Sequence, residues 1–399
     1  MIKKIKNIIN SNYEAILMSL ILLISIFSFF QNLSSIFTTA ILILICFIIS
    51  TKYICFEKKK IQLKINKEIN KITFIMVLFC IYVFLSSKII GDTQNFITLN
   101  SNLFIILTMA LIINESFSCE NIHKPIITYN LIMTILLILC IVLNIDNINR
   151  GVMKFFSYKY DPNYMCSSFL LLFFFQIKFL FAQVNKFRYL NIIIIILFVF
   201  LCLLCGSRGI TLAALFGTII YVLLNFLKKC KKPKKVNIKK VLIFVVIALI
   251  IIILFKYIIP ESTLDRFKIK NMLSFGGRSG IWKKSLQTFL SAPLANKLIG
   301  YGMGSFVSVV QYFNYGMYLM SHNVIINLLI ETGIIGIILF IIMIYFIFKQ
   351  QKENKNYFGI CLTISTLLLY LTLDMNLNFW INIVISSLIL NSKKVGVIK

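Results

Sequence analysis

Long apolar runs recur from one end of the chain to the other, separated by short polar segments. About 20 consecutive apolar residues are enough for a helix to cross the hydrocarbon core of a membrane. The runs are continuous, whereas the strands of a membrane barrel alternate apolar and polar positions. A chain inside a bilayer must satisfy its own backbone polar groups, and helices do so within each segment. The pattern therefore predicts an all-α polytopic membrane protein.

The apolar windows predict about twelve transmembrane helices and one long loop. We expect residues 1–399 to form a single integral membrane domain, without an internal repeat or a separate soluble domain. The longest stretch between predicted spans is 260–321. The predicted helices cover 13–31, 33–53, 72–90, 97–115, 125–145, 163–182, 189–205, 209–227, 241–259, 333–349, 357–373 and 377–391.

Composition and charge agree with this topology. Hydrophobic residues make up 59% of the chain, and its mean hydropathy is +0.92. The net charge of +28 would suggest nucleic-acid binding in a soluble protein. With the N-terminus inside, however, "TKYICFEKKKIQLKINKEINK", "KKCKKPKKVNIKK" and "KQQKENK" all fall on the cytoplasmic side. Cytoplasmic loops of membrane proteins are enriched in Lys and Arg. Most of the positive charge is therefore explained by the orientation of the chain in the membrane, and no nucleic-acid partner is expected.

The loop at 260–321 departs from this rule, because it is predicted to lie outside the cell and is nevertheless basic. Long loops cross the membrane largely regardless of charge, so one interpretation is that the excess of basic residues has no function. The functional interpretation is a surface that receives an anionic group from the outer leaflet. The charged residues are Arg266, Lys268, Lys270, Arg278, Lys283, Lys284 and Lys297, against Glu261 and Asp265.

Part of this loop has helical periodicity. The segment "GRSGIWKKSLQTFLSAP" places Ile281, Trp282, Leu286 and Phe289 at helical spacing, and Pro293 ends the run. This pattern predicts an amphipathic helix lying on the membrane surface.

Arginines near the outer ends of the spans are the first candidates for chemistry, because charges close to a bilayer are costly. Arg208 lies in the tight turn "GSRG", where it either anchors a helix end or binds a ligand. Arg278 lies in "FGGRSGIW" before the predicted surface helix. Two guanidinium groups suit a diphosphate, whose oxygens they can contact bidentately. Arg150 and Arg266 are secondary candidates.

His322 is one of two histidines, and it lies at the end of the long outer loop, whereas His123 falls in a predicted inner loop. Histidine can accept a proton near neutral pH. We find no clustered metal ligands in the sequence, so no metal or cofactor is expected. "GYGMG", residues 300–304, is interpreted as a flexible turn rather than a nucleotide loop. An arginine pair with a histidine suits transfer of a group away from a phosphate leaving group, with the base activating a hydroxyl.

Four segments, in this order, resemble a known family. They are "DPNYMCSSFLLL", "GSRGITLAAL", "GGRSGIWKKSLQTFLSAPLANKLIGYGMGSF" and "SHNVIINLLIETGIIGIILF", within about 150–345. The ordered set resembles the O-antigen ligase/polymerase superfamily of bacterial envelope glycosyltransferases, which includes Wzy-type polysaccharide polymerases and WaaL-like ligases. Each motif is loose alone, and their order with the long loop before "SHN" is more specific.

The resemblance implies a GT-C-like protein of the bacterial cytoplasmic (inner) membrane, with its active site on the extracytoplasmic face. The implied reaction is an inverting, metal-independent transfer of a glycan from undecaprenyl diphosphate. By motif position, Arg208 and Arg278 would bind the diphosphate and His322 would help to activate the acceptor hydroxyl. Further residues that would shape or bind the substrate are Tyr301, Asn323 and Glu331, with Arg150 and Arg266.

Within the superfamily, "DPNY" and "GRSGIW" favour a polymerase that joins O-antigen or capsule repeat units on a lipid-linked acceptor. A ligase would instead attach a finished glycan to lipid A core, protein or the cell wall. An alternative of another class is a flippase of lipid-linked oligosaccharides, although transporters usually place their polar residues near the midplane. Expected partners are membrane lipid and the lipid-linked glycan, with a chain-length regulator and a flippase as possible protein partners.

Overall fold

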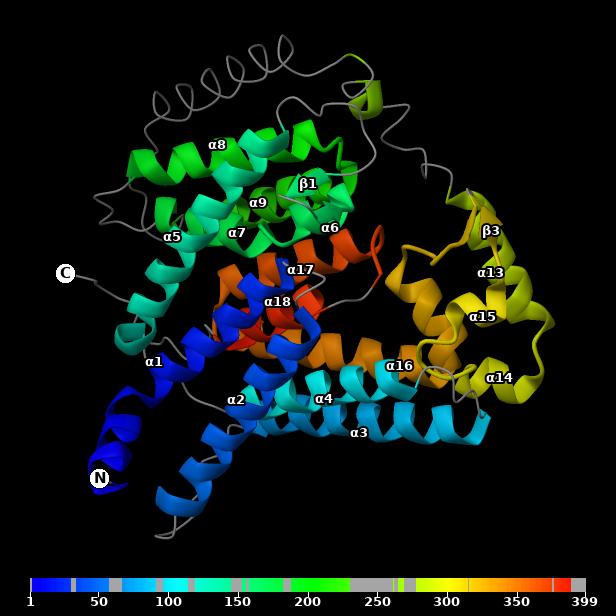
Figure 1. Cartoon of the computed structure of the whole chain (residues 1–399), viewed down its shortest axis with the longest axis horizontal. Coiled ribbons are helices and arrows are strands. Elements are labelled where there is room, and N and C mark those ends of the chain that lie inside the picture. The colour runs from blue at the N-terminus through cyan, green and yellow to red at the C-terminus, as the bar shows by residue number, and fades with distance from the viewer. Residues whose placement is uncertain are drawn as a thin grey trace. The chain divides into compact units, whose positions relative to one another are not determined.

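The computed structural model is mainly helical and divides into two compact units, which we treat separately (Figure 1). The first unit contains residues 1–129, 277–363 and 370–397, and the second contains 130–276, 364–369 and 398–399. The structure describes residues 2–29, 34–56, 67–90, 96–113, 119–144, 153–155, 158–181, 188–229, 261, 265–268, 278–314, 316–374 and 377–388.

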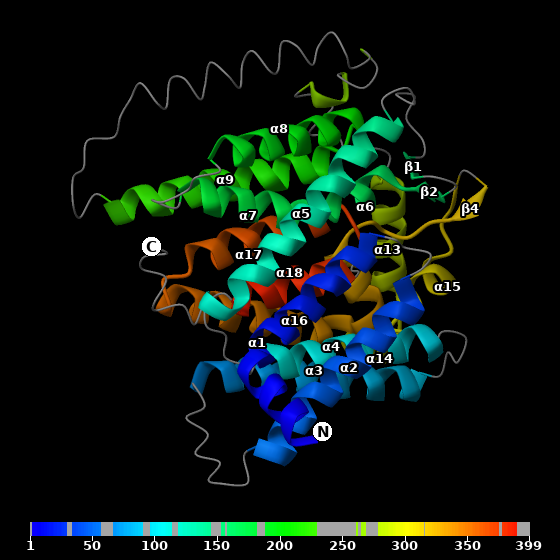
Figure 2. The ribbon, with the colours of Figure 1, turned by 60° about the vertical axis from the view of Figure 1, so that its left-hand side comes forward.

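The first unit combines long apolar helices with the helical part of segment 260–321, which we call the outer loop after its predicted side of the membrane. Helix α16 packs against α3, and α3 packs against α4, so that the three run side by side (Figures 1 and 2). A short antiparallel hairpin, β3–β4, pairs Phe313 with Tyr318. The elements are α1 (Ile2–Phe29), α2 (Ser34–Phe56), α3 (Lys67–Ile90), α4 (Phe96–Ile113), the start of α5 (Cys119–Asn144), α13 (Ser279–Ser291), α14 (Leu294–Ile299), α15 (Phe306–Val310), β3 (Phe313–Asn314), β4 (Met317–Tyr318), α16 (Val324–Glu353), part of α17 (Tyr357–Tyr370) and α18 (Leu377–Leu388).

In the second unit, α7, α8 and α9 pack against one another (Figure 2). An antiparallel hairpin, β1–β2, pairs Met153 with Tyr160 and precedes α6. The elements are the rest of α5, β1 (Met153–Phe155), β2 (Tyr158–Tyr160), α6 (Pro162–Ser167), α7 (Leu170–Phe181), α8 (Arg188–Leu204), α9 (Arg208–Lys229), the 3-10 turn η2 (Asp265–Phe267) and the rest of α17.

Among the described residues, five helices are long and apolar enough to span a membrane. They correspond to the predictions at 72–90, 125–145, 163–182, 209–227 and 333–349. Five other predicted spans coincide with shorter apolar helices, within α1, α2, α4, α8 and α17. The predicted helix at 377–391 is α18, of 12 residues, and the one at 241–259 lies outside the described residues. The chain is therefore a multi-pass helical protein, and the count of twelve stays a prediction.

The predicted helix at 163–182 is interrupted between α6 and α7. The Ser167 and Ser168 hydroxyls both donate to the Tyr164 carbonyl, at 2.7 and 3.3 Å. The Ser168 amide donates to the same carbonyl at 3.3 Å, and the next amide, of Phe169, donates to the Cys166 carbonyl three residues back, at 3.1 Å. The apolar pattern continues across the break, which is why hydrophobicity alone predicts one helix.

The predicted surface helix is present as α13, which ends where Ala292 adopts an extended conformation before Pro293. Its inner face packs into a core formed by α13, α15 and α16. Ile281 is 2% exposed in this core, and Trp282 and Phe289 pack against it. Leu286, on the same helix, lies outside this core and is 46% exposed.

Helix α16 begins at Val324, nine positions before the predicted span, and breaks where that span was expected to start. Gly333 has φ of 63° and ψ of −168° inside α16, a region that only glycine adopts readily. The break removes helical partners from the preceding carbonyls. The Ile330 and Glu331 carbonyls accept instead from the Tyr301 and Gly302 amides, both at 2.9 Å.

Residues 300–304, predicted to form a flexible turn, are therefore hydrogen-bonded to α16 at this break. We call this loop the clamp. Gly300, Gly302 and Gly304 all have positive φ, which lets the loop follow the kinked helix closely. A Cβ at Gly300 would collide with the Glu331 carbonyl, and one at Gly333 with the Leu298 carbonyl. The two segments can approach this closely only because both positions are glycine.

We expect Gly333→Ala to lower the stability of the protein by roughly 3 kcal/mol or more, because it adds a backbone clash to an unfavourable φ. The measurement is the apparent melting temperature of the purified protein in detergent. Gly316→Ala is the matched control, since Gly316 has φ of 80° and an added Cβ there would have no neighbour within 4 Å. This control should cost about 1 kcal/mol. Equal losses in the two variants would contradict the clamp.

Candidate functional site

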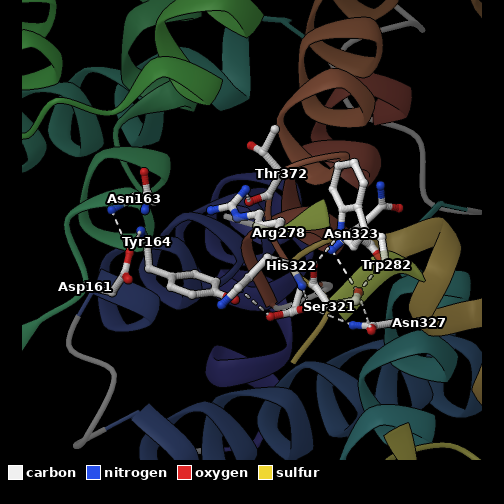
Figure 3. A network of polar contacts seen from close by, with 11 residues as sticks. Asp161, Asn163, Tyr164, Arg278, Trp282, Ser321, His322, Asn323, Asn327 and Thr372 are labelled. Carbon is white, nitrogen blue, oxygen red and sulfur yellow. Dashed lines mark hydrogen bonds and ion pairs between the residues drawn. The ribbon is translucent and has the colours of Figure 1, made fainter. Parts of the chain in front are cut away.

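Two loops of the first unit meet the N-terminal end of α13 beside His322 (Figure 3). The Trp282 indole donates to the Ser321 carbonyl at 2.8 Å. One helical turn earlier, Arg278 Nη1 donates to the Thr372 carbonyl at 2.7 Å. The end of the outer loop and the turn between α17 and α18 are thus both tied to the same short helix.

The His322 ring lies against a carboxylate from this second turn. Its Nδ1 lies 2.9 Å from Asp374 Oδ2, and its backbone amide donates to Asp374 Oδ1 at 2.9 Å. The carboxylate therefore holds the histidine at two points, through the ring and through the main chain. Histidine ring orientation and tautomer are commonly set by such a partner on Nδ1.

Asp374 is itself held in place by α16. Asn327 Nδ2 donates to Asp374 Oδ1 at 2.7 Å, and the Ser321 hydroxyl donates to Asn327 Oδ1 at 2.6 Å. The Ser321 residue is fully buried, and Asp374 is 9% exposed. A buried carboxylate is tolerated when it is paired and hydrogen-bonded, and here both its oxygens have partners.

Asn323 begins α16 and fixes the backbone beside the histidine. Its side chain accepts from the Ile325 and Ile326 amides, at 3.0 and 3.2 Å, so it is the N-cap of the helix. His322, directly before it, has φ of 50°, which is unusual for a residue other than glycine. Such backbone conformations persist where the surroundings enforce them, often at functional sites.

This geometry leaves one ring nitrogen of His322 for chemistry. A neutral ring that carries its proton on Nδ1, the nitrogen facing the carboxylate, presents Nε2 as an unprotonated acceptor. The His322 side chain is 31% exposed, against 12% for Asp374. The ring can therefore be reached from outside, while the carboxylate stays behind it. The pair is suited to general-base catalysis, and Arg278 supplies a positive charge on the neighbouring loop.

Glu331 and Tyr301, both predicted to contribute to the pocket, lie in the clamp on α16. Glu331 is 6% exposed, and its Oε1 accepts from the Phe306 amide at 3.3 Å. Tyr301 packs against the core of α13, α15 and α16. Both residues therefore lie where α16 meets the loop at 300–304, and their contacts stabilise that loop. Asn323 likewise has a structural contact, as the helix cap.

The remaining predicted arginines fall in or beside the second unit. Arg208 is the first residue of α9 and is half-buried. Arg266 Nη1 donates to the Gly206 carbonyl at 3.1 Å, in the turn that leads to Arg208. On the same turn, the Ser207 hydroxyl donates to Asn163 Oδ1 at 2.8 Å. The turn before Arg208 is thus held by two other segments of this unit, and Arg150 lies outside the described residues.

The segment "YDPNY" contains the start of helix α6. Asp161 is the N-cap of α6, and its Oδ1 accepts from the Asn163 amide at 2.7 Å. Pro162 occupies the first helical turn, where its missing amide hydrogen costs nothing. These residues need no ligand to account for them.

Asp374 is the residue that sequence reasoning missed. It lies in a short turn between two predicted spans, "LDMN", which the predicted topology places on the outer face. The available signal was a single carboxylate at the outer end of two apolar helices, where a charge is costly without a partner. Because 52 positions separate it from His322, sequence spacing could not indicate their contact.

The His322 imidazole and the Asp374 carboxylate form a pair rather than part of a larger cluster of ligating groups. Among the described residues, no group of three or more His, Cys, Asp or Glu side chains could hold a metal ion.

Comparison with known families supports the resemblance of the motifs. Residues 193–341 match the model of the family described as O-antigen ligase. This region contains Arg208, Arg278 and His322, and it confirms the resemblance to the O-antigen ligase/polymerase superfamily. A comparison with curated proteins finds no match for the chain.

Proposed function

We propose that the protein is a polysaccharide polymerase. It transfers a glycan from an undecaprenyl-diphosphate donor to the sugar hydroxyl of a lipid-linked acceptor at the outer face of the cytoplasmic membrane. The family match supports a function of the O-antigen ligase or polymerase type. The observation that carries the proposal is the His322–Asp374 pair. Arg278, at the start of α13, is hydrogen-bonded to the same turn that carries Asp374.

In the proposed reaction, the acceptor hydroxyl oxygen attacks the anomeric carbon of the donor sugar. The bond between this carbon and the phosphate oxygen breaks, and undecaprenyl diphosphate leaves with the bonding electrons. The hydroxyl proton passes to Nε2 of His322, and Asp374 stabilises the imidazolium that forms. Attack opposite to the leaving group inverts the configuration at the anomeric carbon. General-base assistance of this kind typically contributes about 10²–10⁴-fold.

Arg278 stabilises the negative charge that develops on the leaving diphosphate. Its guanidinium keeps its charge at any physiological pH and can contact two phosphate oxygens together. The bond to the Thr372 carbonyl fixes one of its nitrogens at 2.7 Å, so the group is oriented before substrate binds. Preorganised charge is usually the largest contribution to catalysis. The motif order gives Arg208 the same role.

A ligase is the second candidate, since the family match covers both activities. The two reactions share the donor, the base and the leaving group, and differ only in the acceptor. "DPNY" and "GRSGIW" favour the polymerase.

A deletion strain probed for surface glycan tests the proposal. A polymerase defect should leave single repeat units attached to their normal acceptor. Long chains stranded on the lipid carrier would instead identify a ligase. Repeat units trapped on the inner leaflet, with no surface glycan, would contradict both and favour a flippase.

In that strain, we expect His322→Ala and Arg278→Ala to abolish polymer, because each removes a group that acts on the reacting atoms. The measurement is the length distribution of surface glycan, with membrane levels of each variant checked in parallel. His123→Ala and Arg188→Ala are matched controls on α5 and α8 and should leave chain length unchanged. Wild-type chain length in either test variant would refute the assignment of the site.

Asp374→Asn should lower the elongation rate by roughly 100-fold or more, because the amide can donate to Nδ1 and favour the wrong histidine tautomer. The rate is measured in membranes that carry lipid-linked repeat units, over a range of acceptor concentrations. We expect the turnover rate to fall while half-saturation and the melting temperature change little. Glu261→Gln, an exposed carboxyl in the outer loop, is the control. A loss of stability without a specific loss of turnover would contradict this role.

A further inference from the structure

Helices α13 and α14 each carry two exposed leucines that the proposed chemistry does not use. On each helix the two leucines are four residues apart, and each lies well outside the core. Their exposed fractions are 46% for Leu286, 68% for Leu290, 72% for Leu294 and 40% for Leu298. Exposed apolar patches of this kind mark interaction surfaces, because exposure to water costs about 25 cal/mol per Å².

These leucines are not the core-facing side of the two helices. On α13, Ile281 and Ser285 are buried against the neighbouring helices. Helix α14 packs against α16 and α13 and has no buried residue of its own. Lys283 and Lys284 are exposed beside the leucines, and Lys297 lies on α14. The outward face therefore combines leucines with lysines, as membrane-surface helices do.

Hydrogen bonds fix the position of α14 along the length of helix α3. The Tyr82 hydroxyl donates to the Thr332 carbonyl at 2.6 Å and contacts the Leu298 carbonyl at 3.4 Å. One and a half turns later, Ser87 Oγ accepts from the Met303 amide at 3.2 Å. Helix α14 and the clamp that follows it therefore lie level with the last turns of α3.

Exposed apolar side chains lie on these turns of α3 and on α16 beside them. Phe84 and Leu85 are 41% and 51% exposed, and the polar residues Ser86, Ser87 and Lys88 follow in the sequence. On α16, Ile334 is 41% exposed directly after the Gly333 break. The α14 leucines are thus level with exposed apolar residues of two helices that are long enough to span a membrane.

We propose that the leucine face of α13 and α14 is inserted into the outer leaflet of the bilayer, with Lys283, Lys284 and Lys297 on anionic lipid headgroups. The occupant of this face is lipid, because the α14 leucines are level with exposed apolar residues of α3 and α16 and the flanking charges are all positive. The proposal goes beyond the glycosyl transfer and does not depend on it. It would hold Arg278, at the start of α13, at headgroup level.

Tryptophan substitution in the full-length protein tests this insertion. Leu290→Trp and Leu294→Trp are compared with Gln287→Trp and Ser291→Trp, which change polar positions of α13. Each protein is reconstituted into nanodiscs of phosphatidylcholine and phosphatidylglycerol, with or without bromine on the acyl chains. The emission of the parent, which contains two tryptophans, is subtracted. Size-exclusion chromatography confirms that each variant is folded and monodisperse.

We expect emission from the leucine positions to be quenched by brominated chains at least roughly twofold more than that from the polar positions, since interfacial helices bury their apolar face by about 5–10 Å. Acrylamide in the water should show the opposite order. Replacing phosphatidylglycerol by phosphatidylcholine should weaken the bromine quenching. Equal exposure of all four positions to acrylamide would overturn the proposal. Protection of the leucine positions from both quenchers would also overturn it, because the face would then be covered by protein.

Discussion

The contact between Asp374 and His322 organises the candidate site. One carboxylate accepts from the His322 main chain and from Asn327 while it faces the imidazole. These contacts tie together the end of the outer loop, the start of α16 and the turn after α17. The His322 backbone has a conformation that few residues adopt unaided, and this network supplies the bonds that hold it. A single acidic side chain thus contacts both the main chain and the ring of the histidine.

The break at Gly333 divides α16 into two segments with different surroundings. The segment before it packs on the outer-loop core and carries the polar residues beneath the histidine. The segment after it is apolar, and several of its side chains are exposed, among them Ile338, Ile341 and Tyr345. A straight helix would have satisfied its own carbonyls and offered none to the loop at Tyr301 and Gly302. The irregular helix is thus what allows this loop to be fastened to a helix long and apolar enough to span a membrane.

Apolar periodicity predicted most of the helices, because burial in lipid imposes the same simple rule on every span. It also predicted the helix at α13, and it predicts an outer-face location for His322 and Arg278 that stays a prediction. It could not predict the α6–α7 interruption, where the hydrogen bonds change locally, nor the clamp formed by 300–304. The contact of Asp374 with His322 was not predicted for a different reason. The two residues are far apart in the sequence, and local spacing carries no information about such contacts. For Leu286, helical spacing identified the helix but not which of its apolar residues face the core.

The site also has an order of assembly. Arg278 and His322 are synthesised well before Thr372 and Asp374, the groups that orient them. Among the described helices, α17 and α18 flank the turn that supplies both groups. The contacts that orient Arg278 and His322 can therefore form only after the whole of α16 has been synthesised.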